Sequence, residues 1–160
     1  MTYQEYKEKS QKEFNDLPIF FAFGNEQFKK AMEERGLTEN DTDKIYRLGD
    51  SGGYYLRTDA PIIREYFKKS KEDKTLEELM KDHDFAVSAF RYEMDNHEYA
   101  INYYQGDWEV IGCFSKKPLE FGDDKNYKDY LYEAGMENLI PWYQEARASH
   151  FKAAEENDWF

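Results

Sequence analysis

The sequence contains a single cysteine, Cys113, among its 160 residues. One cysteine excludes a disulfide within the chain, and scarce cysteine is typical of proteins from reducing compartments, so we expect a cytoplasmic protein. Long apolar runs are also missing, and no stretch approaches the roughly 18 consecutive apolar residues that a membrane-spanning helix needs. The N-terminal segment MTYQEYKEKSQKEF is charged throughout, which does not fit a secretory signal peptide.

Basic residues are scarce relative to acidic ones. The 22 Lys and Arg are outnumbered by 34 Asp and Glu, which gives a formal net charge of -12. Binding to nucleic-acid phosphates requires clustered Lys and Arg, so we expect no direct contact with nucleic acid. Along the sequence the net charge is -2 over 1–40, -6 over 41–114 and -4 over 115–160. Such a charge either serves solubility or presents an acidic face to a basic protein, for example a nucleic-acid-binding one.

β-branched aliphatic residues are few, with only two Val and seven Ile, so we expect sheet to be the minor component. Aromatic residues are abundant instead, with three Trp, fourteen Tyr and twelve Phe. This abundance argues against disorder and predicts a folded protein with an aromatic core. The length predicts one domain over 1–160, with an α+β core over 1–114 and a helical extension over 115–160.

Apolar periodicity and turn residues predict an α+β fold, in which a small, mostly antiparallel sheet packs against several helices and is followed by more. The expected helices span 2–16, 26–35, a stretch beginning near Asp59, a stretch beginning at Thr75, 85–99, a stretch beginning at Asp123 or Asp124, and 139–157. The expected strands are a buried central strand over 19–23, a hairpin formed by 44–48 and 54–57, and a second hairpin around Gly106.

The segment GDSGG at 49–53 contains the only candidate for a serine nucleophile, Ser51. It resembles the nucleophile segment of chymotrypsin-like proteases and also fits the G-x-S-x-G elbow of α/β-hydrolases. The order of the chain disagrees with both, because all three histidines follow Ser51 and the next residues, YYLRT, have a strand pattern rather than a helical one. A glycine-rich hairpin turn explains the same residues.

The segment FAVSAFRYEMDNHEYAINYY, residues 85–104, is the stretch around which we expect the chain to be organised. Within it Glu93 and His97 are four residues apart, so a helix places both on one face, as half of a metal site. Zinc needs three or four ligands, and the others would have to come from His83, His150 or distant acids. The alternative is a structural pair in which the carboxylate orients the imidazole. The residues alone predict no cofactor.

Aromatic side chains near the expected second hairpin suggest a contact surface for another protein. Tyr and Trp are enriched at protein interfaces, and Tyr103, Tyr104 and Trp108 fall together at this turn. We take these three as the candidate partner-binding residues.

Three segments, FAFGNEQF (21–28), KIYRLGDSGGYY (44–55) and FRYEMDNHEYAI (90–101), together resemble a family of short uncharacterised proteins from phages and bacterial mobile elements. The shared pattern is F-x-F-x-x-x-x-F, a Gly-Gly hairpin, and Y-E-x-x-N-H-E-Y, over roughly residues 19–112. The resemblance implies no known activity. It implies an accessory role, such as blocking a host defence enzyme.

The leading hypothesis from the sequence is therefore a non-catalytic acidic protein that binds another protein. The alternative is a small hydrolase or metal-dependent enzyme that uses Ser51, or Glu93 and His97. Geometry distinguishes the two. A histidine within hydrogen-bond reach of Ser51, or a third donor within about 5 Å of both Glu93 and His97, would favour the enzyme.

Overall fold

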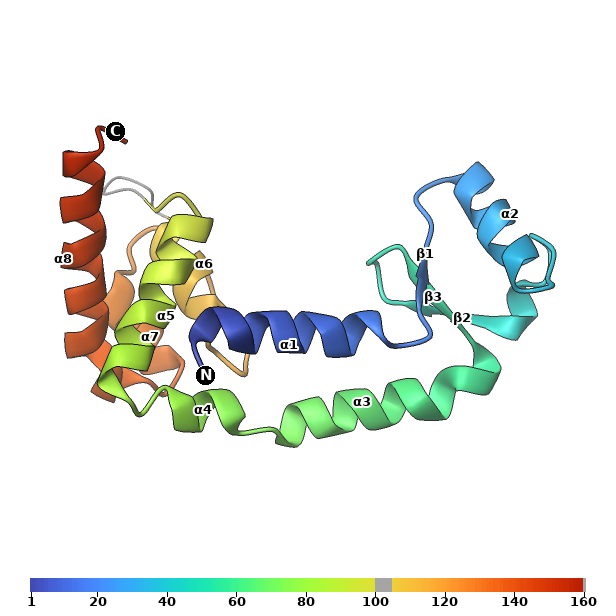
Figure 1. Cartoon of the computed structure of the whole chain (residues 1–160), viewed down its shortest axis with the longest axis horizontal. Coiled ribbons are helices and arrows are strands. Elements are labelled where there is room, and N and C mark those ends of the chain that lie inside the picture. The colour runs from blue at the N-terminus through green and yellow to red at the C-terminus, as the bar shows by residue number, and fades with distance from the viewer. Residues whose placement is uncertain (100–104, 160) are drawn as a thin grey trace. The chain divides into compact units, whose positions relative to one another are not determined.

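The computed structural model describes residues 1–99 and 105–159. It has the expected helix-rich α+β fold, with one three-stranded antiparallel sheet in the described part of the chain (Figure 1). The chain forms two compact units, which we name by their content. The helical unit comprises Met1–Lys7 and Asp73–Phe160, and the sheet unit comprises Glu8–Glu72. Residues 73–99 and 105–159 therefore belong to one compact unit.

The sheet unit contains β1 (Phe20–Phe21), β2 (Ile45–Leu48) and β3 (Gly53–Leu56), in the order β1-β3-β2. The predicted hairpin is confirmed, with Tyr46 opposite Tyr55. The prediction of a buried central strand over 19–23 is wrong. β1 is a two-residue edge strand, and Phe21 and Phe23 are 44% and 73% exposed. An aromatic run is typical of burial, but here only alternate side chains face the core.

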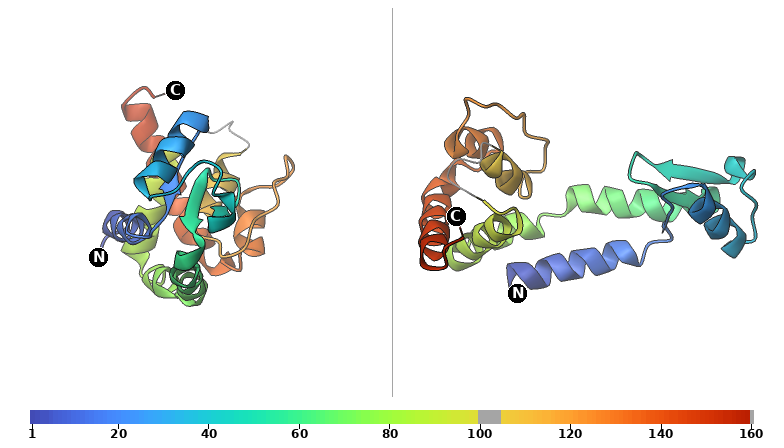
Figure 2. Two further views of the ribbon diagram at one scale, coloured as in Figure 1. Left: turned by 90° about the vertical axis from the view of Figure 1, so that its right-hand side faces the viewer. Right: turned by 90° about the horizontal axis from the view of Figure 1, so that it is seen from above.

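Two helices complete the sheet unit. α2 (Asn25–Glu34) lies beside the sheet in both figures and contributes Met32 to a small core with Phe20 and Ile45 (Figures 1 and 2). Gly24, rather than the expected Asn25, occupies the N-cap position of α2. The second helix, α3 (Ala60–Glu72), carries a proline in its first turn, where a missing backbone N–H costs little. Single-turn 3-10 helices, η1 (Thr42–Lys44) and η2 (Arg57–Asp59), precede β2 and α3.

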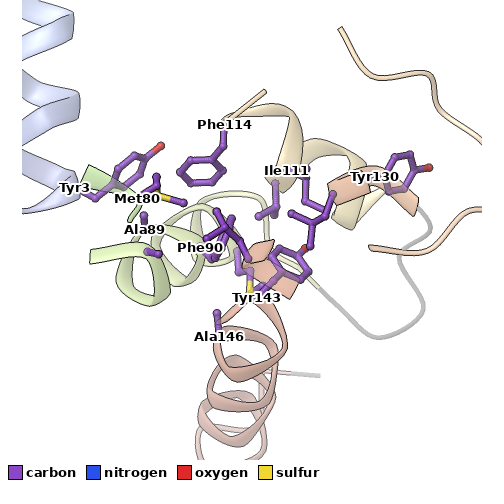
Figure 3. Packing of buried hydrophobic residues seen from close by; sticks show 14 of the residues in the cluster. Tyr3, Met80, Ala89, Phe90, Ile111, Phe114, Tyr130, Tyr143 and Ala146 are labelled. Carbon is purple, nitrogen blue, oxygen red and sulfur yellow. The ribbon is translucent and has the colours of Figure 1, made fainter. Parts of the chain in front are cut away.

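The helical unit is built around α5 (His83–Asn96), along which α8 (Ile140–Glu156) packs. Its other elements are α4 (Thr75–Leu79), α6 (Gly106–Gly112), α7 (Tyr127–Glu133) and the 3-10 helix η3 (Glu137–Leu139). The N-terminal residues of α1 (Tyr3–Asn15) pack against the same core. The core is aromatic, as Figure 3 shows: Phe90 meets Phe114 and Tyr143 edge to face, with ring centroids 5.0 Å apart in each pair.

The second expected hairpin, around Gly106, is wrong, because residues 106–112 form α6. Val110 and Ile111 favour strands by propensity, but both are fully buried against the core, and tertiary packing outweighs propensity. The expected central helix also ends at Asn96 rather than Tyr99, since Glu98 adopts a left-handed backbone with φ of 50°. Within the described residues, no helix has both the length and the apolarity that crossing a membrane would require.

Candidate metal centre

Three metal-ligating side chains converge where α5 ends. Glu93 lies in the last turn of α5, His97 is its C-cap residue, and Cys113 follows α6 directly. The helix has a well-defined start, because the Asp82 side chain accepts a hydrogen bond from the backbone N–H of Phe85. The buried face of α5 includes Phe90. Glu93 follows three residues later on the same buried face, one helical turn before His97.

The donor atoms of these residues form a nearly equilateral triangle. Glu93 Oε2 lies 3.4 Å from His97 Nε2 and 3.5 Å from Cys113 Sγ, and the Sγ atom lies 3.5 Å from His97 Nε2. A third donor therefore lies within about 5 Å of both Glu93 and His97. This donor is Cys113 rather than His83, His150 or a distant acid.

The other oxygen of Glu93 is held by two donors from α1. Its Oε1 accepts hydrogen bonds from the hydroxyl of Tyr3 at 2.7 Å and from the ammonium group of Lys7 at 2.9 Å. Glu93 is fully buried, which alone would raise the pKa of its carboxyl group, but these hydrogen bonds and the Lys7 charge outweigh burial and lower that pKa. Glu93 is therefore a buried carboxylate whose Oε2 lies near His97 and Cys113 and also accepts a long hydrogen bond, at 3.4 Å, from the side-chain amide of Asn96.

The imidazole of His97 is also placed from both sides. Its Nδ1 lies 3.7 Å from Oε2 of Glu109, on α6, while Nε2 faces the triangle. A carboxylate behind the non-ligating nitrogen is the usual outer partner of a metal-binding histidine, because it fixes the tautomer and the ring orientation. The His97 side chain is 28% exposed, so it connects the buried Glu93 to the surface.

The same residues suggest another chemistry, a cysteine nucleophile with His97 as base and Glu109 as orienting acid. The environment of the thiol argues against it. Cys113 has exposed surface, but partial desolvation of its thiol and the negative charge of Glu93 raise the pKa of that thiol to about 12, whereas nucleophilic cysteines need a lowered pKa. A cation bound between the three donors would instead stabilise a thiolate next to a carboxylate.

Ser51 lies in the turn between β2 and β3, in the sheet unit. Its hydroxyl donates a hydrogen bond to the carbonyl of Leu48 at 2.6 Å and accepts one from the backbone N–H of Gly53 at 3.1 Å. The sheet unit, residues 8–72, contains no histidine in its sequence, so it provides no base for Ser51. These contacts are those of a turn residue.

The two other histidines have partners of their own. His83 Nδ1 lies 2.9 Å from Asp84 and Nε2 lies 2.7 Å from Glu145. His150 is buried, with Nδ1 3.0 Å from Asp95 Oδ1 and Nε2 2.7 Å from the carbonyl oxygen of Tyr99. Because a carbonyl oxygen only accepts, Nε2 is the donor of that hydrogen bond.

Of the three predicted partner-binding aromatics, Tyr103 and Tyr104 lie outside the described residues. Trp108 is half-buried on α6, and its indole N–H donates a hydrogen bond to the carbonyl of Leu119 at 2.8 Å. It lines a cavity of about 520 Å³ whose wall also includes His97 and Glu109. Trp108 thus belongs to the surroundings of the metal-ligating cluster.

The chain belongs to a family of proteins of unknown function, DUF7659, whose family model matches residues 2–108. The matched range includes Glu93 and His97, and Cys113 follows it. Neither a curated protein nor a solved structure matches the chain.

Proposed function

We propose that this protein binds a divalent metal ion, with zinc as the best fit, through Glu93, His97 and Cys113. The observation that carries the proposal is the size of the donor triangle. In a tetrahedral zinc site, ordinary Zn–S, Zn–N and Zn–O bond lengths require donor–donor distances of about 3.3 to 3.6 Å. The three edges here measure 3.4, 3.5 and 3.5 Å.

The chemistry of the donors supports zinc over harder cations. Calcium and magnesium prefer shells of oxygen atoms, whereas a thiolate, an imidazole and a carboxylate together are typical of zinc. The outer contacts support it as well, because Tyr3 and Lys7 hold the oxygen of Glu93 that faces away from the triangle. Glu109 lies behind His97 at an ion-pair distance of 3.7 Å, where a carboxylate can act on the non-ligating ring nitrogen.

Three protein donors leave one position of a tetrahedron for water or another ligand, as in catalytic zinc sites. Of the two enzyme candidates that the sequence offers, this geometry supports the pair Glu93 and His97 and gives no support to Ser51. A bound ion at this position would act as a Lewis acid or activate its water, while this chain's residues hold and orient it.

The binding of another protein remains our second proposal, and the charge distribution favours it. The helical unit contains 21 acidic and 10 basic residues, a net charge of -11, whereas the sheet unit contains 13 and 12, a net charge of -1. The acid excess is thus confined to one unit, as a surface for a basic, nucleic-acid-binding partner would be. The resemblance to phage and mobile-element proteins motivates an accessory role, such as inhibiting a host defence enzyme.

The metal proposal is tested by adding zinc to chelator-treated protein in a calorimeter and measuring stoichiometry by native mass spectrometry. We expect one ion per chain, and a rise in melting temperature on adding zinc that a chelator reverses. At zinc concentrations about 100 times the dissociation constant, the stabilisation amounts to roughly 2.7 kcal/mol.

Two ligand variants and one matched control make this test specific. Glu93→Gln and Cys113→Ser should abolish binding, while His83→Gln changes a histidine outside the triangle and should bind like the wild type. Wild-type protein that takes up no zinc, or binding that the three variants share equally, would refute the proposed site.

A further inference from the structure

The cavity of about 520 Å³ adjoins the proposed metal site. His97 belongs to both, and Gly112, which lines the cavity, immediately precedes Cys113. A cavity of this size accommodates a small organic molecule. A Cβ added at Gly112 would meet no atom within 4 Å, so the wall beside the cysteine is open.

An open position on a bound ion would be reached from the protein surface rather than from the interior. Glu93 is fully buried, and Tyr3 and Lys7 cover the side of its carboxylate that points away from the triangle. His97 and Cys113 are the two donors with exposed surface. A fourth ligand would therefore have access from the side of His97 and Cys113, and His97 also lines the cavity.

The cavity wall combines apolar surface with charged groups. Trp108, Pro118 and Leu119 supply the apolar part. Lys116 and Lys117 contribute positive charge, and Glu109, whose carboxylate lies beside His97, contributes one negative charge. The helical unit contains 10 basic and 21 acidic residues, so the adjacent pair Lys116 and Lys117 is a local concentration of positive charge. Lys116 lies 3.7 Å from Glu77 and donates to the carbonyl of Asp73, whereas Lys117 forms no ion pair within residues 1–99 and 105–159.

We propose that the cavity binds a small carboxylate with an apolar body, whose carboxylate takes the open position of the metal while Lys117 neutralises its charge. This inference rests on the metal binding proposed above. The donor set explains the preference: Glu93 and a Cys113 thiolate cancel the two charges of a zinc ion, so Lys117 supplies the positive charge that selects an anion over a neutral analogue. The apolar wall then favours a ligand with a hydrophobic side chain over acetate.

The test uses the full chain loaded with Co²⁺, whose visible absorption bands change when a ligand at the metal is exchanged. We would titrate it with N-acetylphenylalanine, with the corresponding amide, and with acetate. The carboxylate should change the spectrum and saturate, acetate should require concentrations at least tenfold higher, and the amide should leave the spectrum unchanged. Lys117→Ala should weaken carboxylate binding several-fold, while Lys128→Ala, an exposed lysine on α7, should not.

Gly112→Leu gives an independent check, because the added side chain occupies part of the cavity without removing a metal donor. The cobalt spectrum should survive this change and its response to N-acetylphenylalanine should be lost. Failure of Co²⁺ to bind would refute the metal site itself. Binding of Co²⁺ with no response to the carboxylate, or an equal response to the amide, would refute only the anion site and leave the metal site standing.

Discussion

At the scale of single residues, the two oxygens of Glu93 have different partners. Oε1 accepts hydrogen bonds from Tyr3 and Lys7, whereas Oε2 lies near His97 and Cys113 and accepts one long hydrogen bond from Asn96. A buried carboxylate without partners would be costly, so the Lys7 charge is what allows an acid to sit in this core. His83 and His150 each have a carboxylate partner as well, and for His83 this contact should be measurable as a raised pKa.

His83 should titrate above the ordinary histidine pKa of 6.5. Hydrogen bonds that the ring donates to the carboxylates of Glu145 and then Asp84 raise its pKa, because they favour the imidazolium. The stability contributed by this raised pKa is fully present below pH 6.5 and is lost as the pH rises through the folded-state pKa. An NMR titration of the ring proton measures it. Glu145→Gln should lower the midpoint more than Asp84→Asn, and a wild-type midpoint at or below 6.5 would contradict the contacts.

In the hairpin turn, Ser51→Ala and Gly52→Ala should lower the free energy of unfolding by different amounts. Ser51 is exposed and its hydrogen bonds are local, so Ser51→Ala should lower the free energy of unfolding by at most about 1 kcal/mol. The same change should leave any activity intact. Gly52 has a φ of 80°, and a Cβ there would lie 2.5 Å from the Phe23 ring, so alanine should cost about 1–2 kcal/mol for the backbone alone. Urea unfolding measures both. Equal costs, or an activity that requires Ser51, would contradict the turn assignment.

At the scale of elements, α6 determines whether the third donor reaches the other two. Asp107, in its first turn, accepts hydrogen bonds from the hydroxyl groups of Tyr99 at 2.6 Å and Tyr143 at 2.7 Å. Arg147, on α8, donates to the same Tyr99 hydroxyl at 2.7 Å. These bonds fix the start of the helix, and Cys113 stands at its end.

Asp107→Ala should therefore affect both stability and metal binding. Two buried hydroxyl groups lose their acceptor, which should cost roughly 1–3 kcal/mol of unfolding free energy. Because Cys113 lies beyond α6, zinc affinity should fall on the order of 10- to 100-fold, as for other residues that orient ligands. Asp107→Asn keeps an acceptor and should lose less of both. Zinc affinity unchanged in Asp107→Ala would mean that α6 is positioned by packing alone.

The sequence predicts local elements better than the site, for a physical reason. The hairpin of β2 and β3 and the helical face that carries Glu93 and His97 follow from short-range spacing. The α6 helix was missed because Val110 and Ile111 mimic a strand. Cys113, Tyr3 and Lys7 meet Glu93 from 20, 90 and 86 residues away, and no spacing rule relates residues so distant. The only sequence signal for Cys113 is its being the sole cysteine, near an E-x-x-x-H pair.

At the scale of the whole molecule, the net charge differs more between the two units than it does between the successive segments 1–40, 41–114 and 115–160. The net charges of -11 and -1 appear only when residues are grouped by the fold. If the acidic unit attracts a basic partner, the association rate should fall as ionic strength rises from about 0.05 to 0.5 M, since the Debye length shrinks roughly threefold. Stopped-flow measurements with a basic partner, isolated first by a pull-down with the tagged protein, test this. An association rate that does not change with ionic strength would mean that the acidic surface serves solubility only.

The central claim, that Glu93, His97 and Cys113 bind one metal ion, is tested most directly by the near-ultraviolet spectrum of the protein with Co²⁺. Bonding between a thiolate and cobalt produces an intense charge-transfer band, and Cys113 is the sole cysteine, so the band reports this site alone. We predict that the band grows to saturation at one equivalent of Co²⁺, is absent in Cys113→Ser, and is displaced by zinc. A wild-type spectrum without this band, or a band that persists in Cys113→Ser, would contradict the proposed site.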